Sequence, residues 1–456
     1  MFVDFLFERF EQGKELDAIV WRDKVFSYGH LLSRVRYFDE ILVDKGIVRG
    51  SVVALEADFS PDAIALFLSL TERGCILVPL TKSLEMKKGD FRGLAQCEVV
   101  ISVGKNDSVR FSRLPTKADH ALYSKLRSLG HPGLVVFSSG TMGENKAILH
   151  DLVCLLEKFK TPRYRMRAIT FLLFDHLGAI NTMLYQLSNT GCIVTVRDRT
   201  PETVLGAVAK HKVELLPTSP TFINLVLLSE AYKRYDLSSL RTVTYGTEPM
   251  QESTLRRFHE LFPNIRLQQT YGLSEVGVLR SKSKSSDSLW VKVGGEEFQT
   301  RVVNGILQIK AQSAMLGYLN APSPFTEDGW FDTGDLVEVD GDYVKILGRK
   351  SEIINIGGQK VCPSEVESVV QECDNVKEVC VYGERNALVG NIICADVSLK
   401  EKADQRDFIT RLKKHCRSRL PLFKVPVKVN IVNGELHSER FKKKRRIEYS
   451  ANADGS

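Results

Sequence analysis

Residues 138–146 read Ser-Ser-Gly-Thr-Met-Gly-Glu-Asn-Lys and directly follow the apolar run Leu134-Val-Val-Phe137. This pattern predicts a buried strand that feeds a loop. The backbone N–H groups, hydroxyls and glycines of such a loop can surround a polyphosphate, and Lys146 adds a positive charge. The spacing differs from that of the P-loop, which requires Gly-x-x-x-x-Gly-Lys-Ser/Thr. We therefore interpret the stretch as a phosphate-binding loop of another kind, with a plain surface turn as the alternative.

Further signatures follow this loop in a fixed order. They are Tyr271-Gly-Leu-Ser-Glu275, Gly329-Trp-Phe-Asp-Thr-Gly-Asp335, Gly348-Arg349 with Ile356-Gly-Gly-Gln-Lys-Val-Cys-Pro-Ser-Glu-Val-Glu367, and Ser438-Glu-Arg-Phe-Lys-Lys-Lys-Arg445. In this order they resemble the adenylate-forming superfamily, which comprises acyl- and aryl-CoA ligases, adenylation domains of peptide synthetases, and luciferases. The resemblance extends from about Phe26 to Arg445, nearly the whole chain.

The composition is that of an ordinary globular protein. The chain has 456 residues, which is too many for one core, and it is 43% hydrophobic and 26% charged. It contains no apolar run of about 18 residues that could span a bilayer. The N-terminus lacks the basic start and cleavage site of a secretory signal. We therefore expect a cytoplasmic location. The nine cysteines form no Cys-x-x-Cys pair, so zinc is not expected. Their odd number in a cytoplasmic chain indicates reduced thiols.

The net charge of +7 is concentrated near the end of the chain, where residues 442–446 read Lys-Lys-Lys-Arg-Arg. A basic run of this kind is typical of a solvated face. No aromatic residues alternate with it, so nucleic acid is not the expected partner. The resemblance instead assigns this segment to the delivery of a lysine to a nucleotide triphosphate.

The predicted fold class is α/β. Apolar runs such as Val52–Leu55 and Ile76–Val78 alternate with helical patterns, which indicates parallel sheets covered by helices. Short strands between residues 289 and 346 predict a small β-rich subdomain. We expect a large N-terminal domain over residues 1–348, a hinge at 349–352, and a small mobile α+β domain over 353–456.

The resemblance implies that a carboxylate and ATP react to give an acyl-adenylate and pyrophosphate. Because both reactants are anionic, charge neutralisation and positioning are the main tasks of the protein. The residues implied to cradle the phosphates of ATP are Ser138, Ser139, Gly140, Thr141, Gly143 and Lys146. Met142 and Asn145 depart from the usual loop. Glu275 and Thr141 are the implied Mg²⁺ ligands, since Mg²⁺ prefers hard oxygen atoms.

A second set of residues is implied to bind the nucleoside. Asp335 and Arg349 would reach the ribose hydroxyls, because a carboxylate can accept two hydrogen bonds from a diol. Tyr271 and Gly272 would lie along the adenine, with Ser274 in the same motif. Gly246 and Thr247 resemble the end of a strand that lines the adenine and acyl pocket, where a glycine would leave room for the base.

Two residues are implied to act at the carboxylate. His176 would border the acid, although a lone histidine is more often structural. Lys442 would bridge the carboxylate and the α-phosphate, with Lys443 as the alternative because three lysines occur in a row. Phe441 stands where the family has a glycine.

The second half-reaction would pass the acyl group to a thiol. Gly357 and Gly358 would then line a narrow pantetheine tunnel after rotation at Ser351. The expected acceptor is CoA, with the phosphopantetheine of an acyl carrier protein as the alternative. Small and apolar residues near the implied acyl pocket favour a fatty or aryl acid. We expect a monomer or homodimer that is not integral to a membrane. A degenerate nucleotide-binding relative without catalysis is the alternative from a different class.

Overall fold

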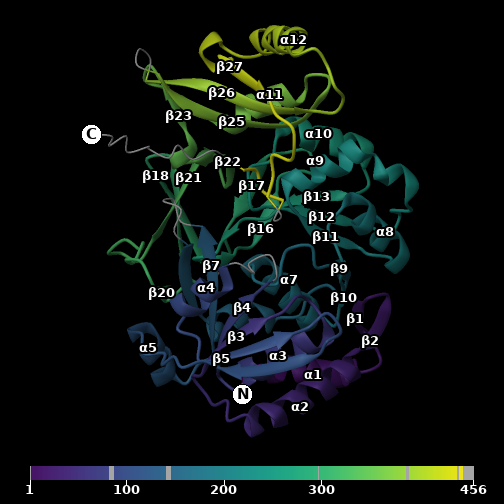
Figure 1. The fold of residues 1–456 in the computed structure, drawn as a ribbon, viewed down its shortest axis with the longest axis vertical. Helices are drawn as coiled ribbons and strands as arrows, with labels where there is room; N and C mark the ends of the chain where they lie inside the picture. Colours follow the sequence, from purple (N-terminus) through teal and green to yellow (C-terminus); the bar gives the residue numbers. More distant parts are fainter. Residues whose placement is uncertain are drawn as a thin grey trace.

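The computed structural model of the chain describes residues 2–81, 87–139, 145–295, 297–386, 390–438 and 441–444. Two large sheets and a smaller antiparallel sheet form the main body, and a separate small unit lies at one end of the long axis, opposite the N-terminus (Figure 1). None of the helices in these ranges is long and apolar enough to cross a membrane.

The first large sheet has the strand order β20-β8-β7-β4-β3-β5-β6. Its central strands are parallel and almost completely buried, as expected for apolar runs with helices on both faces. The strands are β3 (Val52–Glu56), β4 (Ile76–Leu80), β5 (Val99–Val103), β6 (Val109–Arg113), β7 (Gly133–Ser139), β8 (Asn145–Asp151) and β20 (Gly317–Tyr318). β7 and β8 are antiparallel, so the predicted phosphate-binding stretch joins two strands, whereas a P-loop joins a strand to a helix.

The second large sheet has the order β13-β12-β11-β9-β10-β1-β2 and is parallel except for β2. Its strands are β1 (Asp17–Trp21), β2 (Lys24–Ser27), β9 (Arg167–Ile169), β10 (Cys192–Val194), β11 (Leu215–Thr218), β12 (Thr242–Tyr245) and β13 (Arg266–Gln269). Because neighbouring strands run parallel, their carboxyl ends meet at one edge of the sheet.

Helices form three layers around these two sheets. The central layer packs between the sheets and consists of α1 (Asp4–Gln12), α2 (Tyr28–Asp44), α3 (Pro61–Glu72) and α7 (Leu177–Ser188). The outer face of the first sheet packs against α4 (Lys88–Leu94) and α5 (Ala121–Leu129). The outer face of the second sheet packs against α8 (Pro201–His211), α9 (Pro220–Ser229) and α10 (Glu252–Leu261). The short helix α6 (Leu152–Leu156) and the 3-10 turns η2 (Glu157–Phe159) and η3 (Ala231–Arg234) connect these layers.

The third sheet is entirely antiparallel, with the order β16-β17-β22-β21-β19-β18. Its strands are β16 (Ser281–Ser283), β17 (Trp290–Val293), β18 (Phe298–Val303), β19 (Ile306–Ala311), β21 (Phe331–Asp340) and β22 (Tyr343–Arg349), and the hairpin β14 (Gly272–Leu273) with β15 (Gly277–Val278) precedes them. This sheet corresponds to the β-rich subdomain expected from the sequence. It has its own core, which includes Val291, Leu307 and Ile309.

The small unit begins after the 3-10 turn η4 (Lys350–Glu352). It contains a hairpin, a three-stranded sheet and two helices around a core of its own. The elements are β23 (Ile354–Ile356), β24 (Gln359–Val361), α11 (Pro363–Gln371), β25 (Val376–Asn386), β26 (Gly390–Leu399), α12 (Gln405–Arg417), η5 (Leu422–Lys424) and β27 (Lys428–Ile431). The predicted fold class is confirmed. All nine cysteines are free, and only Cys154 is exposed.

Candidate active site

Several of the predicted site residues lie beyond the carboxyl ends of the strands in the second large sheet. Gly246 and Thr247 follow β12, Tyr271 comes shortly after β13, and His176 lies between β9 and α7. In open α/β sheets this edge is the usual place for a ligand. The topology therefore brings together side chains that are far apart in the sequence.

Lys146 and Glu275 are joined through a residue that sequence analysis did not single out. The Nζ of Lys146 lies 4.7 Å from the centre of the Tyr318 ring. The hydroxyl of Tyr318 donates to Oε1 of Glu275 at 3.0 Å. Lys146 itself pairs with Ser138 across β7 and β8, and Ser139 pairs with Asn145. Gly140, Thr141 and Gly143 lie outside the described residues.

The backbone around Glu275 is held by three hydrogen bonds. Nε2 of the buried His150 donates to the Ser274 carbonyl at 2.6 Å. The amide of Met315 donates to the Glu275 carbonyl, and the hydroxyl of Ser313 donates to the Val276 carbonyl, each at 2.8 Å. Burial lowers the pKa of His150 to about 4, so its ring is neutral at pH 7. These contacts hold the backbone that carries Glu275, and its carboxylate accepts the hydrogen bond from Tyr318.

The donor set around Glu275 fits a Mg²⁺ ion shared with phosphate oxygens better than a metal held by protein alone. One carboxylate oxygen accepts from Tyr318, which leaves lone pairs for a further partner. Within the part of the chain that the structure describes, no group of three or more His, Cys, Asp or Glu residues gathers as a metal site. Mg²⁺ commonly uses one or two carboxylates together with substrate phosphates.

Asp335 is buried and lies at the centre of a second polar group. The hydroxyl of Tyr271 donates to Oδ2 of Asp335 at 2.5 Å, and Nε of Arg349 lies 2.9 Å from Oδ1. Burial raises the pKa of Asp335, although the charge of Arg349 and the hydrogen bond from Tyr271 oppose this. The turn that presents Asp335 is formed by Gly334, whose φ of +68° favours glycine.

Tyr271 differs from the expectation that its ring would lie along an adenine. Only 7% of the residue is exposed, and its ring packs in the core of the antiparallel sheet with Val276 and Leu279. Its hydroxyl is committed to Asp335. In this arrangement Tyr271 fixes the carboxylate and does not offer an open aromatic face.

The glycines near the predicted adenine site are required by contacts within the protein. A Cβ at Gly246 would lie 2.7 Å from Oγ1 and 2.8 Å from the carbonyl of Thr270. A Cβ at Gly272 would lie 2.7 Å from the Gly277 carbonyl. Both positions thus need glycine because two backbone segments approach closely, and room for a base is not needed to explain them. Thr247 is exposed and has a φ of +73°.

His176 and Lys442 line the same small pocket. Its other lining residues are mainly apolar or aromatic: Phe171, Leu172, Leu173, Arg199 and Phe441. His176 caps the N-terminus of α7, and its Nδ1 accepts a hydrogen bond from the Gly178 amide at 3.0 Å. This bond places the proton of the neutral ring on Nε2. The two residues expected at the carboxylate therefore meet across the join between the large body and the small unit.

Arg199 is a pocket residue that sequence analysis missed. Its side chain is only 11% exposed, its Nε donates to the Phe171 carbonyl, and its NH2 lies 3.9 Å from a carboxylate oxygen of Asp58. Burial lowers the pKa of Arg199, while nearby aspartates oppose this. The signal available in the sequence was an arginine just after a parallel strand and directly before Thr200, the N-cap of α8.

Lys443 points away from this pocket. Its Nζ lies 2.7 Å from Oε2 of Glu367, a residue of α11 that is 1% exposed, and its amide donates to Glu248. Lys442 is thus the lysine that borders His176 in this arrangement. Gly357 and Gly358 form the exposed tip of the β23–β24 hairpin, with φ values of +54° and +87°, and are not among the residues that line the pocket.

Comparison with known protein families agrees with this arrangement. Residues 6–319 match the AMP-binding enzyme family, and residues 365–443 match the AMP-binding enzyme C-terminal domain. The first match covers well over half of the chain, so the chain belongs to the AMP-binding enzyme family.

Individual relatives are distant but extend over most of the chain. YdaB of Bacillus subtilis, named as an acyl–CoA ligase, is 25% identical over 478 residues, covering 92% of this chain and 93% of YdaB. The long-chain-fatty-acid–CoA ligase FadD13 of Mycobacterium tuberculosis is 24% identical over 454 residues, covering 89% of each chain. The anthranilate CoA ligase AuaEII, solved with anthranoyl-AMP, shares the fold with a TM-score of 0.80 at 18% identity, covering 97% of this chain and 95% of its own. With the family matches, these relatives identify an AMP-forming acid–thiol ligase of the acyl- or aryl-CoA ligase type.

Proposed function

We propose that this enzyme activates a fatty or aryl carboxylic acid with ATP and transfers the acyl group to CoA. The observation that carries this proposal is the pocket shared by His176, Lys442 and Arg199, which places positive and hydrogen-bonding groups among apolar side chains. An apolar pocket with a few polar groups at one end suits an amphiphilic acid. The fatty-acid and anthranilate ligases among the relatives support this substrate class.

In the first half-reaction a carboxylate oxygen attacks the α-phosphorus of ATP. The bond from that phosphorus to the bridging oxygen breaks, and pyrophosphate leaves with the electron pair. Lys442 reduces the repulsion between the two anions and stabilises the charge that builds on the α-phosphate. His176 orients the carboxylate through its Nε2–H.

The nucleotide is positioned by the two polar groups of the large body. Lys146 and the loop of Ser138 neutralise the phosphates, and Glu275 with Thr141 would hold a Mg²⁺ ion, which supplies further charge neutralisation when bound. Asp335 and Arg349 receive the ribose. Although Asp335 already accepts from Tyr271 and Arg349, each carboxylate oxygen has a second lone pair for a ribose hydroxyl.

In the second half-reaction the thiol sulfur attacks the acyl carbonyl carbon, the acyl–phosphate oxygen bond breaks, and AMP leaves. The exposed tip at Gly357 and Gly358 would line the path of the thiol after the small unit turns about residues 349–352. The 3-10 turn η4 separates the cores on either side of this segment, which supports a pivot there.

The deciding experiment is pyrophosphate release by the purified protein across a panel of fatty, aryl and hydroxy acids, with and without CoA. We expect acid-dependent pyrophosphate release and CoA-dependent thioester formation. If a thioester forms only when a phosphopantetheine-bearing carrier protein is added, the acceptor is that carrier protein and not CoA. ATP binding with no acid-dependent pyrophosphate would favour the non-catalytic alternative.

A further inference from the structure

Phe441 contacts aromatic residues from both parts of the molecule. Its ring centre lies 5.3 Å from that of Phe171 and 5.5 Å from that of Phe222, both in the large body. On its other side it stacks on His437 at 5.5 Å with an interplanar angle of 17°. Aromatic pairs at these separations stabilise an arrangement beyond the area that they bury. Phe441 therefore bridges the C-terminal segment and the core of the second large sheet.

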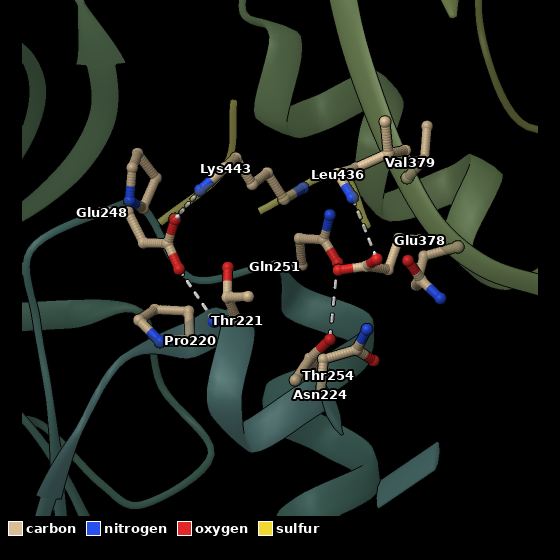
Figure 2. Close-up of a pocket in the computed structure, with 12 residues that line it drawn as sticks. Pro220, Thr221, Asn224, Glu248, Gln251, Thr254, Glu378, Val379, Leu436 and Lys443 are labelled. Carbon is tan, nitrogen blue, oxygen red and sulfur yellow. Dashed lines mark hydrogen bonds between the residues drawn. The ribbon is translucent and has the colours of Figure 1, made fainter. Parts of the chain in front are cut away.

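The backbone on both sides of Lys442 is also bonded to the large body. The hydroxyl of Ser219 donates to the Phe441 carbonyl at 2.8 Å. The Lys443 amide donates to Oε2 of Glu248 at 3.1 Å, and Oε1 of the same carboxylate accepts from the Thr221 amide at 2.8 Å (Figure 2). Ser219 caps α9, so these contacts converge on the N-terminal end of that helix. Lys442 is held from both neighbouring residues.

The same segment is fixed on its other side to the small unit. Nδ1 of His437 lies 2.6 Å from Oε1 of Glu378. The Leu436 amide donates to Oε2 of Glu378 at 3.2 Å (Figure 2). Burial acts to raise the pKa of Glu378. The hydrogen bond and the charge of His437 outweigh burial, so the pKa of Glu378 lies below its usual range. Lys443 adds its ion pair with Glu367. The position of Phe441, and with it that of Lys442, is therefore tied to the position of the small unit.

The backbone conformation at residue 441 does not favour a phenylalanine. The aromatic contacts of the Phe441 side chain therefore account for the presence of this residue. Phe441 has a φ of +52°, a left-handed conformation that a bulky residue rarely adopts and that glycine adopts freely. A phenylalanine here carries strain that a glycine would avoid. The aromatic contacts and the two backbone hydrogen bonds offset this strain only while the segment lies against the large body.

We propose that Phe441 is a positioning residue that anchors Lys442 in the acid pocket and so holds the small unit in the arrangement for adenylate formation. This inference rests on the proposed function for its kinetic consequences. The part of the inference that concerns how the small unit is held against the large body does not depend on the proposed function. Loss of the anchor selectively slows adenylate formation, whereas thioester formation does not need it.

The kinetic test compares Phe441→Gly, Phe441→Ala and Phe441→Tyr. Glycine and alanine both remove the ring, but only glycine relieves the strain, and tyrosine keeps the aromatic contacts. We expect adenylate formation to slow by about tenfold to a hundredfold in the glycine and alanine variants and to remain within about threefold in the tyrosine variant. Thioester formation from supplied acyl-AMP should be at least as fast as in the unchanged enzyme. Equal losses in both half-reactions, or no loss in either, would overturn the proposal.

A second test reads the arrangement without any substrate. Oγ of Ser253 in α10 and Oγ of Ser368 in α11 lie 3.3 Å apart across the join. The pair Ser253→Cys and Ser368→Cys, placed in a Cys154→Ser background, should form a disulfide under mild oxidation. We expect Phe441→Gly to slow this cross-link by about tenfold. Leu422→Ala, at a side chain that is 78% exposed on the small unit, is the matched control and should leave the rate unchanged.

The two tests fail in different ways. If the protein has no ligase activity but Phe441→Gly still slows the cross-link, the proposed function is wrong and the anchor stands. If the enzyme is active and the cross-link rate of Phe441→Gly equals that of the unchanged protein, the anchor is wrong and the function stands.

Discussion

The two ends of the candidate site are held together by different parts of the chain. At the nucleotide end, Lys146, Glu275, Asp335 and Arg349 all belong to the large body. Tyr318 links Lys146 to Glu275, and Arg349 pairs with Asp335. At the acid end, His176 comes from the large body and Lys442 from the segment that follows the small unit. We therefore expect the nucleotide end to persist if the small unit turns, and the acid end to be complete only in the present arrangement.

This contrast predicts that Lys442→Ala separates the two half-reactions. Adenylate formation should fall by about 10² to 10³, or ~3–4 kcal/mol, because a charge that stabilises the transition state is lost. Thioester formation from supplied acyl-AMP should be unchanged. Rapid-quench measurement of each step checks this. Lys444→Ala, at an exposed side chain of the same lysine run, is the matched control. A loss in Lys443→Ala as large as that expected for Lys442→Ala, with Lys442→Ala active, would assign the role to Lys443.

The nucleotide end should be sensitive to acid because His150 supports the Glu275 turn. Burial lowers the pKa of His150 from 6.5 to about 4, so the unfolded chain binds the proton more readily than the folded one. A group of this kind contributes stability above pH 6.5 that is lost as the pH falls toward 4. Between pH 7 and pH 5 this amounts to about 2 kcal/mol.

The corresponding experiment measures the free energy of unfolding by denaturant at both pH values. The unchanged protein should lose about 2 kcal/mol more than His150→Gln, which cannot titrate. Identical pH dependence in the two proteins would show that His150 remains neutral without consequence for stability.

Sequence patterns were sufficient for the fold class, because apolar runs are local signals. Glycine-rich motifs, which are also local, supplied the candidate residues of the nucleotide end, whose roles stay predictions. β3 spans Val52–Glu56 and β4 spans Ile76–Leu80, which include the two apolar runs from which parallel strands were expected. Contacts between distant segments left no such signal. Tyr318 on β20, and Arg199 between β10 and α8, became visible as site residues only once these segments had been placed in space. Tyr271 was expected to face a ligand, because its hydrogen-bond partner Asp335 is 64 residues away and left no local signal in the sequence.

At the nucleotide end, we expect the carboxylate of Asp335 to favour ATP binding but not the stability of the fold. Burial raises the pKa of Asp335, so folding favours the protonated carboxyl. The stability that this protonated carboxyl contributes is lost as the pH rises through the pKa of Asp335 in the folded protein. Asp335→Asn should therefore leave the melting temperature at pH 7 unchanged or higher. The KM for ATP should rise about tenfold, because a charged acceptor for the ribose is lost. A lower melting temperature with an unchanged KM would make Asp335 a structural residue.

The smallest expected effect concerns the segment between the two parts. Ser351 lies in the 3-10 turn η4. Residues in such turns generally have φ of about −50° to −70°, which includes the value near −65° that proline imposes. Ser351→Pro should therefore preserve the present arrangement and change adenylate formation less than twofold. Turning of the small unit requires φ changes near this residue, so thioester formation should slow by about fivefold. Ser351→Ala is the control, because it keeps rotation about φ. Equal slowing of both half-reactions by proline would place the pivot elsewhere, and the acid end would then need another route to release Lys442.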